Sequence, residues 1–269
     1  MRVLIAGAGY VGGALAGQLA TAGHAVTALR RTPAATPPGV DAVAADLTDP
    51  ASLRALHGPF DAVVYAAAPD ARSEAAYRKV YQDGVAAVLD SVPCERFLLT
   101  SSTSVYAQDA GEWVDEASAT EPAHFTGRTV LAGEAIARER HPQACSVRFG
   151  GLYGPGRSRL LAAAREGRLA YAVDPPRYTN RIHRDDAAGL LAHLLAAKDL
   201  APAYIGVDCD PAAEETFYRW LAERAGGPRP LPGSEAGGGA GKRASNRLAL
   251  ASGYRFRFPT FREGYGALA

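Results

Sequence analysis

The chain has 269 residues, of which 48% are apolar, and this length suits one large α/β domain or a domain with a smaller appendage. Its formal net charge of +1 provides no strong field, so neither nucleic acid nor an anionic membrane surface is expected as a partner. No apolar stretch approaches the roughly 20 residues that cross a membrane. Because the N-terminus already resembles a core strand, a signal peptide is not expected either, and we expect a cytoplasmic protein.

The three cysteines stand far apart in the sequence, at Cys94, Cys145 and Cys209. Their spacing is not that of metal ligands, so no metal site is expected. In a cytoplasmic protein, such residues are expected to be buried, reduced thiols.

A glycine-rich motif lies near the N-terminus, between a predicted strand at 2–6 and a helix that begins at Tyr10. In this G-x-G-x-x-G motif, Gly7 allows the tight turn, Gly9 lets the backbone approach a pyrophosphate, and Gly12 lets the helix pack closely on the strand. The N-terminus of the helix, with Tyr10 and Val11, would present free N–H groups to the anion. The motif therefore predicts a dinucleotide site rather than a mere tight turn.

The second predicted strand, at 25–29, ends in Arg30 and Arg31. In dinucleotide-binding folds an acidic residue near this position bonds the ribose 2′-hydroxyl of NAD, whereas arginine suits a 2′-phosphate. The pair therefore predicts NADP(H) in preference to NAD(H). The alternative is a pair of solvated surface arginines.

Strands and helices alternate through the rest of the first half, which predicts an α/β fold with a doubly wound parallel (Rossmann) sheet. A strand at 41–45 ends at Asp46 and Leu47, and a helix at 50–56 follows. The strand at 60–68 ends in small residues that leave room for a cofactor, a long helix covers 72–92, and a strand at 97–100 follows. The further candidate cofactor-binding residues in this half are Asp46, Leu47, Ala66, Ala67 and Ser101.

A hydroxyl-rich stretch at 101–106 comes directly after a predicted strand, a place that carries function more often than packing. An irregular loop at 107–125, a helix at 127–138 and a strand at 146–149 complete a dinucleotide-binding domain that spans 1–152.

Residues 153–269 form a smaller, more interrupted substrate-binding lobe, whose elements can interleave with the first half in one compact unit. Helices are expected at 159–166, at 187–195 after a cap at Asp185 or Asp186, and at 214–224, with a strand at 203–207. The Gly- and Pro-rich stretch 226–241 is expected to be a mobile loop.

Four motifs stand out along the chain: Gly7-x-Gly9-x-x-Gly12, the Ser-rich segment through Val105-Tyr106, Arg148 with Tyr153-Gly154-Pro155-Gly156, and Asn180-Arg181-Ile182-His183-x-Asp185-Asp186. Together they resemble the extended short-chain dehydrogenase/reductases, and most closely the NAD-dependent epimerase/dehydratase type in its shorter, atypical branch. The resemblance covers nearly the whole chain and implies a Rossmann sheet, a small C-terminal substrate lobe and an active site in the cleft between them. It also implies a small-molecule substrate and allows a homodimer.

The resemblance implies a proton relay made of a Ser or Thr after the fifth strand, a Tyr, and a Lys four residues later that lowers the pKa of the Tyr. Counting back from Tyr106 places Ser102 at the Ser/Thr position. Glu134, a residue that the family often has four positions after its Lys, places Val130 at the Lys position and Thr126 at the Tyr position. Because Val130 has no charge and an alcohol is far less acidic than a phenol, the ordinary relay is expected to be absent.

If the protein is an enzyme, another group must move the proton. His124 lies two residues before Thr126, and imidazole exchanges protons near neutral pH. The alternative is a solvated loop histidine. Tyr106 is a second candidate, with a packed aromatic as its alternative. Ser102 and Thr103 are candidates to bond a substrate carbonyl.

Candidate substrate-binding residues also begin the C-terminal lobe, where Arg181 would pair with a phosphate or carboxylate. The alternative for three of them, Asn180, Arg181 and His183, is a structural turn and helix cap. The full candidate set is Thr103, Tyr153, Asn180, Arg181 and His183.

Two functions follow from these observations. The first is an NADP-dependent oxidoreductase or nucleoside-diphosphate-sugar epimerase/dehydratase-like enzyme with a non-standard proton donor. The second is a catalytically inactive protein that senses NADP(H) or binds it in a regulatory role.

Overall fold

The computed structural model describes residues 1–32, 36–54, 56, 58–157, 159–233 and 239–268. The chain divides into two compact units that are not consecutive in sequence. The first comprises Met1–Tyr106, Thr120–Arg148 and Ala187–Tyr204, and the second Ala107–Ala119, Phe149–Asp186 and Ile205–Ala269. The predicted domain boundary after residue 152 lies close to Phe149, where the chain enters the second unit for a long stretch.

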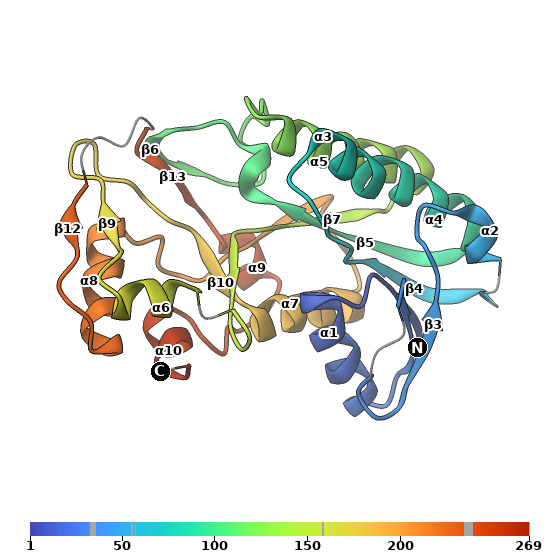
Figure 1. The fold of residues 1–269 in the computed structure, drawn as a ribbon. Helices are drawn as coiled ribbons and strands as arrows, with labels where there is room; N and C mark the ends of the chain where they lie inside the picture. Colours follow the sequence, from blue (N-terminus) through green and yellow to red (C-terminus); the bar gives the residue numbers. More distant parts are fainter. Residues whose placement is uncertain (33–35, 55, 57, 158, 234–238, 269) are drawn as a thin grey trace. The chain divides into compact units, whose positions relative to one another are not determined.

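A seven-stranded parallel sheet forms the centre of the fold, in the order β11-β7-β5-β4-β1-β2-β3 (Figure 1). β1 lies between β2 and β4, with Val3 opposite Val26 on one side and Ala62 on the other. The strand order reverses at β1, and ligands of doubly wound sheets bind at such a switch point. The α/β prediction is confirmed. The strands are β1 Arg2–Ala6, β2 Ala25–Arg30, β3 Val40–Ala44, β4 Phe60–Tyr65, β5 Cys94–Ser102, β7 Cys145–Phe149 and β11 Ala203–Gly206.

Helices cover both faces of this sheet, as its continuously apolar strands require. Figure 1 shows α1 on one side and α3, α4 and α5 on the other. The core on the side of α4 includes Leu4, Val63, Phe97, Leu99 and Val88, all fully buried. The helical segments here are α1 Tyr10–Thr21, α2 Pro50–Leu53, α3 Glu74–Arg78, the π-helix η1 Lys79–Gly84, α4 Val85–Ser91, the short 3₁₀ turn η2 Thr103–Val105, α5 Phe125–Arg140 and α7 Arg184–Ala196.

The long helix predicted at 72–92 is present as a continuous helical stretch from Glu74 to Ser91, and its middle part is the π-helix η1. The buried Tyr65 hydroxyl donates to the Val80 carbonyl at 2.6 Å. A Cβ on Gly84 would lie only 2.4 Å from the same hydroxyl oxygen. The hydrogen bonding thus changes from α-helical to π-helical where the Tyr65 side chain of β4 contacts the helix. The spacing of apolar residues in the sequence does not reveal such a contact.

The second unit contains shorter elements and small two-stranded sheets that pair β8 with β10, β9 with β12 and β6 with β13. Its core is aromatic, and includes Tyr153, Phe217, Phe261 and Tyr265. The elements are β6 Ala110–Val114, β8 Gly151–Tyr153, α6 Arg159–Arg165, β9 Ala170–Tyr171, β10 Arg181–His183, α8 Glu214–Ala225, β12 Leu231–Pro232, β13 Gly241–Ala244, α9 Arg247–Ala251 and α10 Phe261–Gly266.

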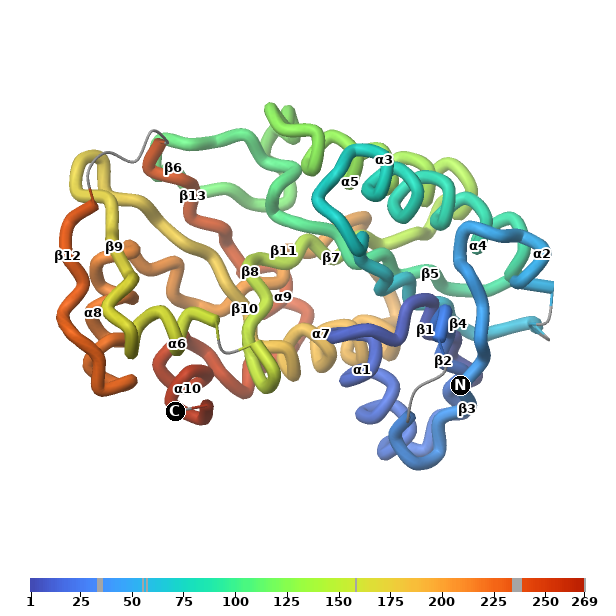
Figure 2. The backbone as a smooth tube through the Cα atoms, in the orientation of Figure 1, coloured from blue at the N-terminus to red at the C-terminus, as the bar shows by residue number. Residues whose placement is uncertain are grey.

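Two stretches expected to be irregular contain strands. β6 lies within the predicted loop 107–125, and it runs beside β13 from the far end of the chain (Figure 2). The Asp109 carboxylate fixes the pairing by accepting from the N–H groups of Gly239 (3.0 Å) and Gly241 (2.9 Å). The predicted mobile loop 226–241 includes β12 and the first residue of β13. Residues 234–238 of that loop lie outside the described part of the chain.

The cysteines are free thiols in three different environments. Cys145 is buried, Cys94 is half-buried and Cys209 is exposed. The expectation of a buried thiol is therefore wrong for Cys209, because this residue lies in the turn after β11 rather than in a strand. Within the described residues, no helix is long and apolar enough to cross a membrane.

Candidate functional site

The glycine-rich loop joins β1 to α1 in the first unit, and two of its glycines are required by the fold itself. Gly7 has a φ of +102°, and a Cβ there would lie 2.5 Å from the Ala67 nitrogen. A Cβ on Gly12 would lie 2.3 Å from the Gly7 carbonyl oxygen and 3.0 Å from the Ile5 side chain. Both positions therefore need glycine for close packing of the strand, the turn and the helix.

Gly9 differs, because a Cβ there would meet no described atom within 4 Å. Gly9 is also the N-cap of α1, and among the described residues no side chain caps this helix end. The first N–H groups of a helix are not used by its own hydrogen-bond ladder, and α1 begins directly after Gly9. Tyr10 is half-buried and Val11 is buried. This end of α1 fits a pyrophosphate, which matches the predicted role of the loop.

The end of β4 lies directly against this loop. The Ala66 N–H donates to the Ala6 carbonyl at 2.8 Å, and the Ala67 backbone contacts Gly7. Both alanines are half-buried, so their small side chains leave the surface beside the loop accessible. The structure thus brings the predicted residues of β1 and β4 together.

Asp46 and Leu47 follow β3, beside the end of β2, where the Ala45 N–H donates to the Arg30 carbonyl at 3.0 Å. The Asp46 carboxylate accepts from the hydroxyl (2.7 Å) and the N–H (2.9 Å) of Thr48. These hydrogen bonds, with the charge of Lys79 3.6 Å away, hold the pKa of Asp46 below its usual value. Asp46 therefore shapes the turn after β3, and Leu47 stays half-buried beside it.

The two arginines at the end of β2 are in different situations. The exposed Arg31 donates two hydrogen bonds of 2.7 Å to the carboxylate of Asp70. This partnership raises the pKa of Arg31 and lowers that of Asp70. The half-buried Arg30 has no side-chain hydrogen bond or ion pair to any described residue. Of the predicted pair, Arg30 is thus the one without a competing carboxylate among the described residues, and nothing in the sequence indicated the role of Asp70.

A buried polar network joins β5, α5 and β7. Ser101 donates to Glu134 Oε1 at 2.5 Å. Arg148 donates through Nε to Oε1 (3.0 Å) and through Nη2 to Oε2 (2.7 Å) of the same carboxylate. Its Nη1 donates to the Tyr106 hydroxyl at 2.7 Å. The network therefore holds the start of the hydroxyl-rich segment against the inner face of α5.

This network defines the surroundings of two predicted site residues. Tyr106 is 2% exposed, and the Arg148 guanidinium carbon lies over its ring, 5.1 Å from the ring centroid. That placement favours the packed-aromatic alternative over a role in proton transfer. The Ser101 hydroxyl is directed to Glu134 rather than to the surface. Glu134 and Arg148 were not predicted as site residues, although a Glu on an otherwise inward-facing stripe of α5 is a signal for such a pair.

The remaining candidates of the first unit lie close to one another. Ser102 is half-buried, and its oxygen accepts from the Ser104 N–H at 3.1 Å. A Cβ on Gly127 would lie 2.3 Å from the Ser104 carbonyl oxygen, so the first turn of α5 packs directly on η2. Thr126 precedes Gly127 in that turn and is half-buried, as is Thr103 in η2. The structure thus places Ser102, Thr103 and Thr126 at one junction.

Two further α5 positions bear on proton transfer. His124 is the N-cap of α5, and its side chain is exposed. Val130 lies one turn after Thr126 and is 1% exposed, so the position expected for the relay Lys is occupied by a fully buried apolar side chain.

The candidates of the second unit are mainly built into its interior. Asn180 joins β10 to β13 by donating to the Lys242 carbonyl (2.8 Å) and accepting from the Ala244 N–H (2.7 Å). Arg181 is 4% exposed, hydrogen-bonds Thr179, and lies 3.8 Å over the Phe217 ring. These placements favour the structural alternative for both residues.

His183 and Tyr153 belong to the same interior. His183 lies 4.1 Å from the Phe258 ring and 5.4 Å from Tyr153, and burial lowers the pKa of its imidazole. Tyr153 stacks on Tyr265 with ring centroids 4.2 Å apart. Near Arg181, burial raises the pKa of the Asp208 carboxyl to about 7, against the opposing effect of the arginine charge.

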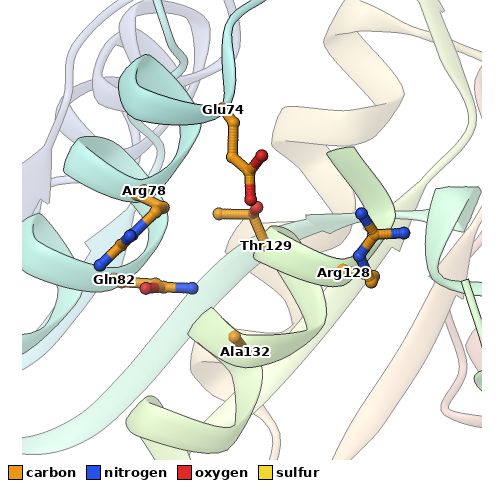
Figure 3. Close-up of a pocket in the computed structure, with 6 residues that line it drawn as sticks. All are labelled: Glu74, Arg78, Gln82, Arg128, Thr129 and Ala132. Carbon is orange, nitrogen blue, oxygen red and sulfur yellow. The ribbon is translucent and has the colours of Figure 1, made fainter. Parts of the chain in front are cut away.

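A polar pocket of about 330 Å³ lies between α3, η1 and α5 (Figure 3). In the figure the Glu74 carboxylate points toward Thr129, and Arg78 and Gln82 lie along one side. Its lining residues are Glu74, Arg78, Gln82, Arg128, Thr129 and Ala132. None of them belongs to the predicted cofactor or catalytic set, so this pocket is distinct from the glycine-rich loop and the Ser102 junction.

The doubly wound sheet, the glycine-rich loop and the accessible N-terminus of α1 define a dinucleotide-binding protein of the Rossmann class. More particularly, the chain belongs to the NAD-dependent epimerase/dehydratase family, whose model matches residues 3–199. The family and the geometry of the loop together support a nicotinamide dinucleotide as the cofactor.

Solved structures agree with this assignment. A putative NAD-dependent epimerase/dehydratase from Methylobacillus flagellatus is 34% identical, with 99% of this chain and 97% of that chain covered and a TM-score of 0.83. The human epimerase family protein SDR39U1, solved with NADPH, is 24% identical over 100% of this chain and 99% of that chain, with a TM-score of 0.81. MoeE5, solved with UDP-glucose and NAD, is 23% identical over 99% and 96%, with a TM-score of 0.77. The last two show a shared fold. No curated protein sequence matches the chain.

Proposed function

We propose that the protein is an NADP(H)-dependent oxidoreductase or nucleoside-diphosphate-sugar epimerase/dehydratase-like enzyme that moves a proton without a Tyr–Lys pair. The observation that carries the cofactor part is the open space at Gly9 beside the uncapped end of α1, with Arg30 at the end of the neighbouring strand. Relatives of the same fold add support, since SDR39U1 was solved with NADPH and MoeE5 with UDP-glucose and NAD.

The residues that would hold the cofactor have distinct tasks. The N–H groups at the start of α1 bind the pyrophosphate, and the small residues Ala66 and Ala67 allow the dinucleotide to lie along the ends of β1 and β4. Arg30 binds the 2′-phosphate, because its guanidinium has no described carboxylate to neutralise it. When bound, the nicotinamide supplies or accepts a hydride.

The chain's own groups for the substrate lie at the junction of η2 and α5. Because the Ser102 oxygen accepts from the Ser104 N–H, its hydroxyl hydrogen remains to donate to a substrate oxygen. Thr126 adds a second hydroxyl beside it but is too weakly acidic to move a proton unaided. His124 is the N-cap of the same helix and lies two residues before Thr126, and we assign it the proton transfer because imidazole is suited to that role.

A specific observation favours a second candidate function. Val130 fills the position of the relay Lys with a buried apolar side chain, and Tyr106 is fixed by Arg148. A protein that has the cofactor-binding residues but lacks the Tyr–Lys proton relay could act as a sensor of the NADP redox state. Such a sensor must bind NADP and NADPH with unequal affinity, because a ligand shifts only states that it distinguishes.

The cofactor part is tested by titrating the purified chain with NADPH and NADH and following nicotinamide fluorescence. We expect tighter binding of NADPH, and loss of that preference in Arg30→Met, because NADH has no phosphate for Arg30 to contact. Arg140→Met is the matched control, since Arg140 pairs with Asp90 on α4 and should leave both affinities unchanged. Equal affinities in the unmodified protein, or an unchanged preference in Arg30→Met, would contradict the assignment.

The enzyme and the sensor are separated by turnover. The chain is incubated with NADP(H) and a panel of nucleoside-diphosphate sugars and small carbonyl compounds, and products are identified by chromatography and NMR. The enzyme predicts turnover that Ser102→Ala and His124→Gln both lower without weakening NADPH binding. No turnover, together with unequal affinities for NADP and NADPH, favours the sensor instead.

A further inference from the structure

The charges at the ends of β2, β3 and β4 are nearly balanced. Arg31 pairs with Asp70, and Lys79 lies 3.6 Å from Asp46. Each carboxylate thus offsets one cation, whereas Arg30 has no counter-charge among the described residues. This arrangement matters because a phosphate monoester carries about −1.5 to −2 charges near neutral pH, more than one guanidinium balances.

Asp70 reaches Arg31 from the other side of β1. β2 and β4 flank β1 in the sheet, and Asp70 follows Ala66 and Ala67, the residues directly after β4 that lie against the glycine-rich loop. The Arg31–Asp70 pair therefore spans the ends of three strands at the switch point. It lies beside Arg30, the residue to which we assign the 2′-phosphate.

The geometry of the pair is that of a guanidinium holding a phosphate. Nη1 and Nη2 of Arg31 each donate to a different oxygen of Asp70, both at 2.7 Å. Arginine uses the same two-pronged geometry for carboxylate and for phosphate. The two side chains are 61% and 66% exposed, so water and salt screen their attraction, and a more highly charged anion can replace the carboxylate.

We propose that Asp70 is a specificity-determining residue of the cofactor site, which competes with the 2′-phosphate for Arg31 and so limits the preference for NADP(H) over NAD(H). This inference rests on the proposed function, since it requires a dinucleotide at the glycine-rich loop. When NADP(H) binds, Arg31 exchanges the Asp70 carboxylate for phosphate oxygens and joins Arg30. NAD(H) has only a 2′-hydroxyl and leaves the pair intact.

The exchange predicts a selective effect of removing the carboxylate. Asp70→Asn keeps the size of the side chain but frees Arg31 and removes a negative charge beside the phosphate. From the usual strength of exposed ion pairs we expect NADPH to bind about two- to fivefold more tightly. NADH affinity should change by less than about twofold, because its ribose offers no charge to compete for Arg31.

The test measures dissociation constants for NADPH and NADH at low and high salt, in the full chain and in five variants. Asp70→Asn and Asp70→Ser should give the same selective gain, and the gain should shrink at high salt. Asp90→Asn is the matched control, because Asp90 is also an exposed carboxylate paired with an arginine, but on α4. In Arg31→Met, adding Asp70→Asn should change the NADPH dissociation constant by less than about twofold further, because there is no longer an Arg31 guanidinium to release.

Several results would overturn the inference. If replacing Asp70 lowers the melting temperature and weakens the binding of NADPH and NADH equally, its role is purely structural. An equal gain in Asp90→Asn would assign the effect to net charge. A chain that prefers NADPH through Arg30 but is indifferent to Asp70 would leave the proposed function standing while refuting this inference. A chain that binds neither dinucleotide would refute both.

Discussion

The buried pair of Glu134 and Arg148 should be the most sensitive polar contact of the first unit. Their side chains are 0% and 6% exposed, and two hydrogen bonds join them. Burial acts to lower the pKa of Arg148, but the hydrogen bonds and charge of Glu134 outweigh it, and the pKa lies above its ordinary value. Without Glu134 only burial would act on this pKa, but the ordinary pKa of arginine is so far above neutral that Arg148 should remain charged when its partner is removed.

The change is Glu134→Met, which keeps the length of the side chain and removes its charge. Breaking one side of a buried ion pair costs about 3–5 kcal/mol, because the other charge is left without compensation. Folded domains are stable by only about 5–15 kcal/mol, so this single substitution removes a large share of the stability. In a chain of this size the melting temperature should fall by roughly 10 °C.

The assay is urea unfolding of a double-mutant cycle of Glu134→Met, Arg148→Met and the two together. The double variant no longer contains an isolated buried charge, so its loss should be smaller than the sum of the single losses by about 2 kcal/mol or more. It should still be less stable than the unmodified chain, because the hydroxyls of Ser101 and Tyr106 lose their partners. Additive losses in the cycle would refute the reasoning.

A matched control uses the exposed pair of Arg140 and Asp90, whose side chains are 34% and 61% exposed. Arg140→Met should cost less than about 1 kcal/mol, since solvent screens such pairs. A cost equal to that of Arg148→Met would show that burial is not the cause.

The remaining predictions concern the loop, the second unit and the thiols. Gly9→Ala should keep the melting temperature but weaken NADPH binding at least about tenfold, because its Cβ enters open space where the pyrophosphate is proposed to lie. Gly12→Ala should lower the melting temperature itself, because its Cβ would meet a backbone oxygen at 2.3 Å; similar melting curves for the two variants would contradict this contrast. Burial raises the pKa of Asp208 from 3.8 to about 7, so the folded chain keeps a proton that the unfolded chain releases, and stability falls as the pH rises from about 4 to 7. Asp208→Asn should therefore be more stable than the unmodified chain above pH 7, by roughly a few kcal/mol, with little gain near pH 4; parallel urea midpoints across this range would contradict the assignment. Mass spectrometry after brief treatment with a thiol reagent should find Cys209 labelled first and the buried Cys145 only on unfolding, and the reverse order would contradict the described burial.

The first half of the fold could be predicted from sequence because its signals are local. The apolar run of β1, the glycines and the helical spacing of Val11, Leu15 and Leu19 all lie within one short stretch, and these three side chains are buried as expected. Amphipathic spacing also located α5, predicted at 127–138 and observed at Phe125–Arg140. The structure also distinguishes the three glycines: a Cβ added at Gly7 or Gly12 would clash with the backbone, whereas a Cβ added at Gly9 would enter open space.

The features that sequence did not predict depend on contacts between distant residues. β6 pairs with β13, which lies more than 120 positions later in the chain. A strand of only five residues is too short to show a clear alternation of apolar and polar side chains in the sequence. Asp70 acquires its place only because β2 and β4 flank β1 in the sheet. For Tyr106 and Arg181 the sequence left a functional and a structural role open, and only the fold shows that both are buried beside partners contributed by other elements.

The spacing of α5 explains why the proposed enzyme cannot regain an ordinary relay by one substitution. Thr126, Val130 and Glu134 follow one another at four-residue intervals and so lie along one side of the helix. Glu134, the last of the three, already pairs with Arg148, and Val130, between the other two, is fully buried. A lysine at that position would bring a second cation into an interior whose carboxylate is already engaged, and burying an uncompensated charge is costly. Thr126 alone is half-buried beside η2, with Ser102 on the adjoining segment. In the proposed enzyme, binding of the dinucleotide and movement of a proton would therefore depend on separate groups, and we expect substitutions to remove each without the other.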